Sequence, residues 1–244
     1  TGVYNHIAGD GREYVITDNT AVKLRAEDGR GIRNVDISMF IKDLPNKKDT
    51  TAFSTLDASG STSQAAGVIE SLEAGSRLFL IDEDTSATNF MLRDDFMQEV
   101  INWEKEPITP FLERARDLYE KAGVSTILVA GSSGAFFYIA DQILQMDNYL
   151  PVDITEKVKT LCLKHKAPRT QAPGFQIPDF HRTLPPFRRE ASDMSRRGGR
   201  GNRSQHEHMK IKVFGKDSFS LDKEMIDLRY VEQLADSEQT CALA

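Results

Sequence analysis

Residues 77–89 read Arg-Leu-Phe-Leu-Ile-Asp-Glu-Asp-Thr-Ser-Ala-Thr-Asn, and this stretch decides the fold class. Its apolar run, Leu78–Ile81, is short and unbroken, which is typical of a strand buried on both faces in a parallel sheet. The run ends in three carboxylates, Asp82, Glu83 and Asp84. Carboxylates at the end of a buried strand are costly to desolvate unless a cation lies among them.

Ligands of open α/β sheets bind beyond the carboxyl ends of the strands. The carboxylate run therefore favours a hydrated Mg²⁺ held by one carboxylate, with a neighbouring carboxylate that orients or deprotonates a water molecule. A solvated and inert acidic turn is the alternative interpretation, because charge runs are usually solvated.

A second stretch upstream, Ala58–Gln64, predicts the start of a helix. Ser61 and Gln64 have the spacing of a capping box. Apolar residues then follow with helical spacing at Ala65, Val68, Ile69 and Leu72. The backbone N–H groups and the dipole of a helix N-terminus favour an anion such as phosphate. Ser59 precedes Asp82 by 23 residues, which is enough for one helix, one turn and one strand.

This order of serine-rich segment, helix, strand and Asp-Glu pair resembles the signature, Walker B and D-loop run of the ATP-binding cassette (ABC) ATPases. The stretches Tyr4–Glu13 and Ala26–Arg30 are also similar to a soluble branch of that family, the predicted ATPases of the ABC class. The resemblance covers nearly the whole chain. It implies an α/β fold of the ABC-type P-loop NTPases, with a C-terminal α+β extension.

The resemblance also implies ATP and Mg²⁺ as cofactors and a role for individual residues. Asp82 would hold Mg²⁺ through water, and Glu83 would orient the attacking water as the catalytic residue. Ser59, Gly60 and Ser61 would bind the γ-phosphate of an ATP held on a second, facing cassette. Gln64 and Asn89 would complete the set of ATP-binding residues. A second cassette, in a homodimer or in an intramolecular pair, is therefore an expected partner.

The chain departs from the family pattern in two places. No G-x-x-x-x-G-K-[ST] loop occurs in the 244 residues, so we expect a segment carrying this Walker A loop upstream of Thr1, and ATPase activity only in the full-length protein. The turn Gly131–Gly134, after a predicted buried strand at Ser125–Ala130, lacks the family's switch histidine. Ser132 or Ser133 is expected in its place, and we choose Ser133 as the catalytic candidate. Serine hydrogen-bonds phosphate but does not carry a proton as imidazole does, which puts fast hydrolysis in doubt.

The charge of the chain is uneven. Leu161–Lys216 holds 13 Lys and Arg against 4 Asp and Glu, a net charge of +9, so the other residues carry −15 within a total of −6. An Arg/Gly-rich tract in this stretch favours single-stranded RNA as a partner, through phosphate charge and base stacking. Its arginines are Arg196, Arg197, Arg200 and Arg203. A flexible basic loop held near the acidic remainder of the protein is the alternative.

The family resemblance and the change in composition predict three parts of the chain. These are an ATPase core over residues 1–160, a mobile Pro/Arg/Gly-rich segment over 161–208, and strands with a terminal helix over 209–244 that pack on the core.

No apolar run approaches the roughly 20 residues that span a bilayer, so no membrane partner is expected. Two cysteines form no disulfide framework, which favours a reducing compartment. Within the family, the chain resembles a kinetoplastid branch that is mitochondrial and associated with RNA editing. This resemblance implies a mitochondrial location, with the cytoplasm as the alternative.

The sequence therefore predicts an ATPase that couples its nucleotide state to the binding of single-stranded RNA, in mitochondrial RNA editing or processing. Two alternatives remain open. One is an ABC-class ATPase that remodels a protein partner without RNA, and the other is an inactive scaffold that keeps the ABC fold.

Overall fold

The computed structural model describes residues 15–44, 47–94, 96, 100, 106–168, 172–180, 210–231 and 233–244. The chain divides into two compact units. The larger unit is Asp18–Asp179, and the smaller unit combines residues 180–244 with residues 1–17. The larger unit thus extends beyond residue 160, where the sequence pattern predicted the end of the core.

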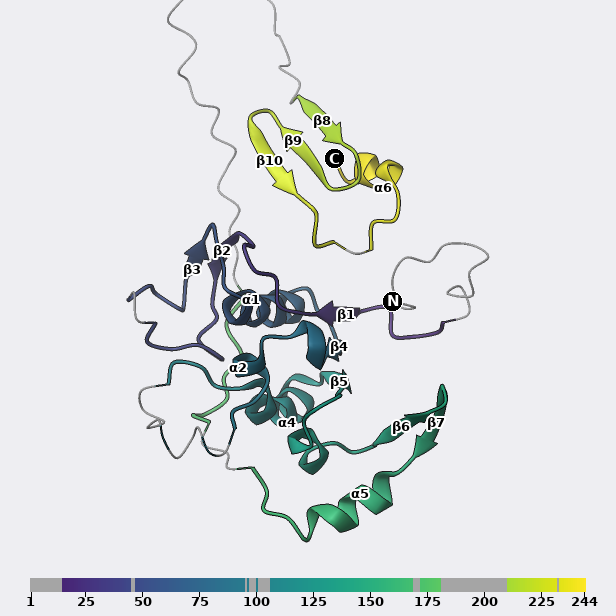
Figure 1. The fold of residues 1–244 in the computed structure, drawn as a ribbon. Coiled ribbons are helices and arrows are strands. Elements are labelled where there is room, and N and C mark those ends of the chain that lie inside the picture. The colour runs from purple at the N-terminus through teal and green to yellow at the C-terminus, as the bar shows by residue number, and fades with distance from the viewer. Residues whose placement is uncertain are drawn as a thin grey trace, which may run out of the picture. The chain divides into compact units, whose positions relative to one another are not determined.

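The larger unit is built on a parallel sheet with the strand order β1–β4–β5 (Figure 1). The strands are β1 (Ala21–Leu24), β4 (Leu78–Asp82) and β5 (Ser125–Val129). The central strand β4 pairs with β1 on one edge and with β5 on the other, and its Phe79 and Ile81 side chains are buried. The strand predicted from the apolar run is therefore confirmed, and so is its place in a parallel sheet. The predicted burial on both faces is wrong, because Leu78 and Leu80, on the face opposite Phe79 and Ile81, are partly exposed.

The strand β5 lies at one edge of this described sheet. Its Ile127 and Val129 side chains are exposed, at 57% and 62%. A β-strand was predicted over Ser125–Ala130 and is present, but the prediction that it is buried is wrong for the described residues.

Helices connect the strands of the sheet. The helix α1 (Gly60–Glu73) lies between β3 and β4 in the chain and packs against β1, β2 and α2 (Thr88–Met91). The helix α4 (Phe111–Ala122) packs against α2 and β5, and it ends at Gly123 in the left-handed conformation that glycine adopts without strain. This alternation of strands and helices gives a mixed α/β fold, as the sequence predicted. Within the described ranges, no helix is long and apolar enough to cross a membrane.

Three aromatic rings fill the core beside α2 and α4. The ring of Phe90 lies 5.0 Å from that of Phe40 and 6.3 Å from that of Phe111, measured between centroids. All three side chains are buried. Tilted aromatic contacts of this kind bury a large apolar area and fix α2 against the segment after β2.

Two small antiparallel sheets complete the larger unit. The strands β2 (Ile32–Val35) and β3 (Phe53–Thr55) form one of them. The strands β6 (Leu144–Asp147) and β7 (Leu150–Asp153) form a hairpin that extends away from the parallel sheet and leads into α5 (Thr155–Cys162) (Figure 1).

The smaller unit contains the strands and terminal helix predicted for residues 209–244. An antiparallel meander joins β8 (Ile211–Phe214), β9 (Ser218–Leu221) and β10 (Glu224–Asp227). The helix α6 (Ser237–Leu243) begins with a capping box made by Asp236 and Gln239. The buried Thr240 hydroxyl donates to the carbonyl of Lys216 at 2.7 Å, which joins α6 to the turn between β8 and β9.

A buried arginine explains why the larger unit extends past residue 160. Arg114 on α4 is 1% exposed and donates from Nε to the carbonyl of Met39 at 3.1 Å. Its Nη1 donates to the carbonyl of Pro173 at 2.7 Å, and its Cζ lies 6.0 Å from the ring centroid of Phe175. Burial lowers the pKa of Arg114, because desolvation disfavours the charged form. Arg114 thus links residues 172–179 to α4 and to the segment after β2.

Replacing Arg114 by alanine is expected to lower the free energy of unfolding by about 3 kcal/mol, because two carbonyls are left without a donor and a cavity remains. Urea unfolding of the protein measures this decrease. The control is Arg116→Ala on the same helix, where the side chain is 40% exposed and the expected decrease is within about 1 kcal/mol. Equal decreases in the two variants would contradict the structural role of Arg114.

Candidate nucleotide site

The segments that carry most of the candidate site residues follow the strands of the parallel sheet at the same edge. Because β1, β4 and β5 run parallel, the segments after Leu24, Asp82 and Val129 begin at the same carboxyl edge. This is the edge at which ligands of open α/β sheets bind. The turn after β4, the turn after β5 and the loop after β1 are therefore neighbours.

The chain turns sharply at the end of β4. Asp82 is partly exposed, and its Oδ1 accepts a hydrogen bond from the backbone N–H of Asp84 at 3.2 Å. The carbonyl of Asp82 accepts from the Ser86 hydroxyl at 2.8 Å, which closes the short 3₁₀ turn Glu83–Thr85. In the ranges that the structure describes, no group of three His, Cys, Asp or Glu residues is arranged to hold a metal ion. One carboxylate with water and phosphate oxygens suits Mg²⁺, so the role of Asp82 as a ligand through water stays a prediction.

Glu83 is held by the turn that follows β5. Its Oε2 accepts from the backbone N–H groups of Gly131 at 2.9 Å and Ser132 at 3.1 Å. Its Oε1 accepts from the Ser132 hydroxyl at 2.6 Å. The Ser132 hydroxyl, with further help from the backbone N–H groups of the turn, lowers the pKa of Glu83, because these donors favour the ionised form. Glu83 is therefore a carboxylate at neutral pH.

The structure brings Ser132 to Glu83 and gives Ser133 another partner. The Ser133 hydroxyl accepts from the backbone N–H of Ala135 at 3.3 Å, within its own turn. From the sequence, either serine could replace the switch histidine, and we chose Ser133 as the catalytic candidate. A catalytic role for Ser133 stays a prediction. The contact of Ser132 with Glu83 joins residues that are 49 positions apart, so spacing along the chain could not indicate it.

The predicted helix start at the serine-rich segment is confirmed. Ser59 is the exposed N-cap of α1, and its hydroxyl accepts from the backbone N–H of Thr62 at 3.5 Å. The predicted capping box of Ser61 with Gln64 is wrong, because the cap is Ser59 and the Gln64 side chain bonds elsewhere. Ser61 lies in the first turn of α1, where backbone N–H groups have no partner within the helix and suit an anion.

Gln64 links α1 to the turn after β4. Its amide is buried, its Oε1 accepts from the backbone N–H of Ala87 at 2.9 Å, and its Nε2 donates to the Ser86 hydroxyl at 2.9 Å. The amide is thus engaged within the fold, and its predicted contact with ATP stays a prediction. Asn89 lies on α2 just after this turn and is exposed.

Gly60 permits the closest approach in the site. A Cβ at this position would lie 3.2 Å from Ala26 Cβ, 3.4 Å from Asp28 Oδ1 and 3.5 Å from Ala87 Cβ. The start of α1 therefore lies directly against both the loop after β1 and the turn after β4. The loop is also joined to α1 by the Ser63 hydroxyl, which accepts from the backbone N–H of Glu27 at 2.9 Å.

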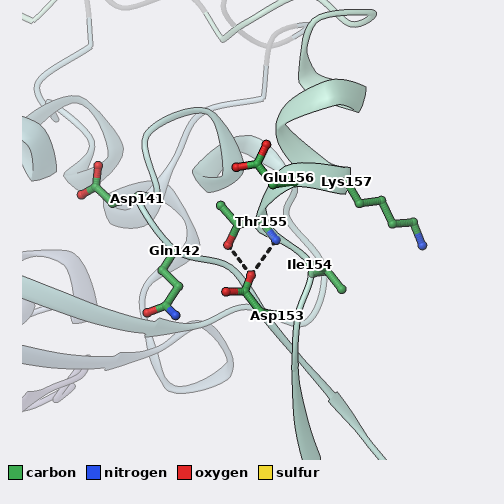
Figure 2. A pocket seen from close by; sticks show the side chains of 7 residues that line it. All are labelled: Asp141, Gln142, Asp153, Ile154, Thr155, Glu156 and Lys157. Carbon is green, nitrogen blue, oxygen red and sulfur yellow. Dashed lines mark hydrogen bonds between the residues drawn. The ribbon is translucent and has the colours of Figure 1, made fainter.

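A pocket of about 650 Å³ lies elsewhere in the larger unit, at the start of α5 (Figure 2). Its lining residues are Asp141, Gln142, Asp153, Ile154, Thr155, Glu156 and Lys157. Asp153 accepts from the hydroxyl of Thr155 at 2.6 Å and from its backbone N–H at 2.9 Å, and these bonds lower the pKa of Asp153. Asp153 thus satisfies donors at the start of a helix, and none of the predicted site residues lines this pocket.

Comparison with known families decides what kind of protein carries this geometry. The model of the ABC_ATPase P-loop domain matches residues 1–182, about three quarters of the chain. This chain belongs to the ABC ATPases. The match contains the parallel sheet of this ABC ATPase and all of its described site residues, although the chain holds no Walker A loop. The arginines predicted to bind RNA, Arg196, Arg197, Arg200 and Arg203, lie outside the described residues.

Two further comparisons give matches to other proteins. One of them covers the C-terminal residues, which lie outside the P-loop domain. A model of the MRB1590 C-terminal domain matches residues 210–244, which include the meander and α6. The chain is also 29% identical over 136 residues to the uncharacterized protein MJ1628 of Methanocaldococcus jannaschii. The aligned part covers 54% of this chain and 29% of that protein, so this chain corresponds to under a third of the relative's length.

Two glycines on α1 give opposite predictions. Gly60→Ala is expected to lower the free energy of unfolding by about 1–2 kcal/mol, because its Cβ would lie closer to Ala26 than side chains normally pack. The matched control is Gly67→Ala, whose Cβ would meet Leu24 Cδ2 at an ordinary 3.6 Å. Gly67→Ala is expected to raise the free energy of unfolding by up to about 1 kcal/mol, since alanine favours a helix interior. Urea unfolding measures both, and equal effects would contradict the close approach at Gly60.

Proposed function

We propose that this ABC ATPase, as a full-length protein, binds and hydrolyses ATP with Mg²⁺ and couples its nucleotide state to the binding of single-stranded RNA. The observation that carries the proposal is the gathering of Asp82, Glu83 and the N-terminus of α1 at the carboxyl edge of one parallel sheet. The family match supports nucleotide binding at this edge.

The residues at the sheet edge suit a nucleotide and its metal ion. Asp82, at the end of β4, would hold Mg²⁺ through water. The bound ion would neutralise the charge of the ATP phosphates. Glu83, which is ionised and adjacent to Asp82, would orient the attacking water. The first turn of α1 would contact the γ-phosphate of an ATP held on a second cassette, through the hydroxyls of Ser59 and Ser61 and the backbone N–H of Gly60.

The RNA part of the proposal rests on charge. Leu161–Lys216 carries a net charge of +9, in a chain whose total is −6. Clustered arginine and glycine suit single-stranded nucleic acid, because arginine neutralises phosphates and stacks on bases. The match to the MRB1590 C-terminal domain supports the kinetoplastid branch of the family, and with it a role in mitochondrial RNA editing or processing. Remodelling of a protein partner without RNA is the alternative use of the same ATPase.

One observation favours an inactive scaffold as a second candidate. The Glu83 carboxylate already accepts three hydrogen bonds within the chain, and the turn that supplies them lacks a histidine. Without an imidazole, this turn has no group that carries a proton as histidine does, which would slow hydrolysis and leave nucleotide binding intact.

Glu83→Gln in the full-length protein is expected to lower the ATP turnover number by about 10²-fold or more, because the amide cannot accept a proton from water. Phosphate release and fluorescent-nucleotide binding measure turnover and affinity, and affinity is expected to change little. The control is Glu120→Gln, an exposed glutamate on α4. Turnover at the wild-type rate in Glu83→Gln would remove Glu83 from its role, and a wild-type protein that binds no ATP would favour the scaffold.

Replacing Arg196, Arg197, Arg200 and Arg203 together by alanine is expected to weaken the binding of an oligouridine strand. The slope of log affinity against log salt concentration should fall by about 0.7 for each phosphate that the variant no longer neutralises. Fluorescence anisotropy over a salt series, with and without ATP, measures both effects. The matched control replaces the same residues by lysine, which keeps the charge and most of the affinity. Unchanged affinity in the alanine variant would direct the search toward a protein partner for this tract.

A further inference from the structure

The ends of β4 and β5 lie side by side, and this places the turn after β5 beside Glu83. Asp82 pairs in register with Val129, so Glu83 and the turn beginning at Gly131 follow directly from a matched pair of strand positions. Gly131 is 48 residues from Glu83 along the chain, and only the strand pairing brings the two together.

The turn contacts both carboxylate oxygens of Glu83. Two consecutive backbone N–H groups, of Gly131 and Ser132, donate to Oε2, and the Ser132 hydroxyl donates to Oε1 at 2.6 Å. A short bond from a hydroxyl to an ionised carboxylate is stronger than a neutral hydrogen bond. With both oxygens held, rotation of the carboxylate about its last side-chain torsion is restricted. The only proton of the Ser132 hydroxyl is committed to Glu83.

We propose that Ser132 is the positioning residue for Glu83 in ATP hydrolysis, and not a ligand of the γ-phosphate. This inference rests on the proposed ATPase function. Glu83 is a partly exposed side chain on a short turn, so its carboxylate needs an outside partner to present a fixed orientation to water. The Ser132 hydroxyl is that partner, and it comes from the turn after the neighbouring strand. Fixed orientation of a general base lowers the barrier without any tighter binding of substrate.

The two roles for Ser132 predict different kinetics. A phosphate ligand contributes to ATP binding, so its removal raises KM. A positioning residue acts only through Glu83, so its removal lowers kcat and has no effect once Glu83 itself is replaced. Ser132 is exposed, so its substitution leaves the core intact, and threonine keeps a hydroxyl on Cβ at the same position.

The test is steady-state ATP hydrolysis by the full-length protein. Ser132→Ala is expected to lower kcat roughly tenfold with KM for ATP within about twofold, since the hydroxyl that orients the base is removed. Ser132→Thr, which keeps the hydroxyl, is expected to restore most of the turnover. In the Glu83→Gln background, Ser132→Ala should cause no further decrease. The matched control is Ser125→Ala, at the opposite end of β5, where turnover should equal that of the wild type.

Several outcomes would overturn the positioning role. They are an unchanged or raised kcat in Ser132→Ala, a parallel rise in KM, a failure of threonine to rescue, and an additive decrease in the double variant. A wild-type protein that hydrolyses no ATP would instead overturn the proposed ATPase function, and the positioning role with it. The two failures are thus distinguishable, because the first occurs against normal wild-type turnover.

Discussion

The pairing of β4 with β1 on one edge and β5 on the other is the constraint on which the rest of the larger unit depends. Parallel pairing brings three carboxyl ends to one edge of the sheet, although the strands are separated by long stretches of chain. The buried side chains of Phe79 and Ile81 hold the central strand in place. Every described candidate residue of the nucleotide site lies on β4, on α1 or its N-cap, or on a segment that follows one of these strands.

Side chains that join distant segments then give this edge its shape. Gln64 joins α1 to the turn after β4, and Glu83 joins that turn to the one after β5. Both side chains accept hydrogen bonds from backbone N–H groups of a segment far away in the sequence, and the Gln64 amide does so from a buried position. Gly60 has a complementary role, because the absence of a side chain lets α1 approach two loops at once. The residues that the family resemblance connects with ATP therefore also build the structure of the site.

Local sequence patterns predicted which segments form helices and strands, but they predicted less well how those elements are buried and which contacts they make. The apolar run at Leu78–Ile81 and the helical spacing after Ser59 each predicted the right element, because periodicity reflects which side of the backbone is apolar. The capping box was wrong because Ser59, two residues before Ser61, is the N-cap, and because the Gln64 side chain bonds to the turn after β4. The burial of β5 was wrong because an apolar strand does not indicate which segment covers it. The hydrogen bond between Arg114 and Pro173 joins residues that are 59 positions apart, and no spacing rule indicates it.

By itself, the sequence determined the order of the site elements along the chain. They are a serine-rich helix start, a strand of the parallel sheet, and Asp82 and Glu83 at the end of that strand. Short-range steric and solvation effects decide these features, and they act between neighbouring residues. Only the tertiary structure decided that Glu83 bonds to Ser132, that Gln64 faces Ala87, and that Gly60 lies against Ala26. These contacts depend on which strands pair and in which register. The free energy of that pairing comes from the whole sheet and its packed helices.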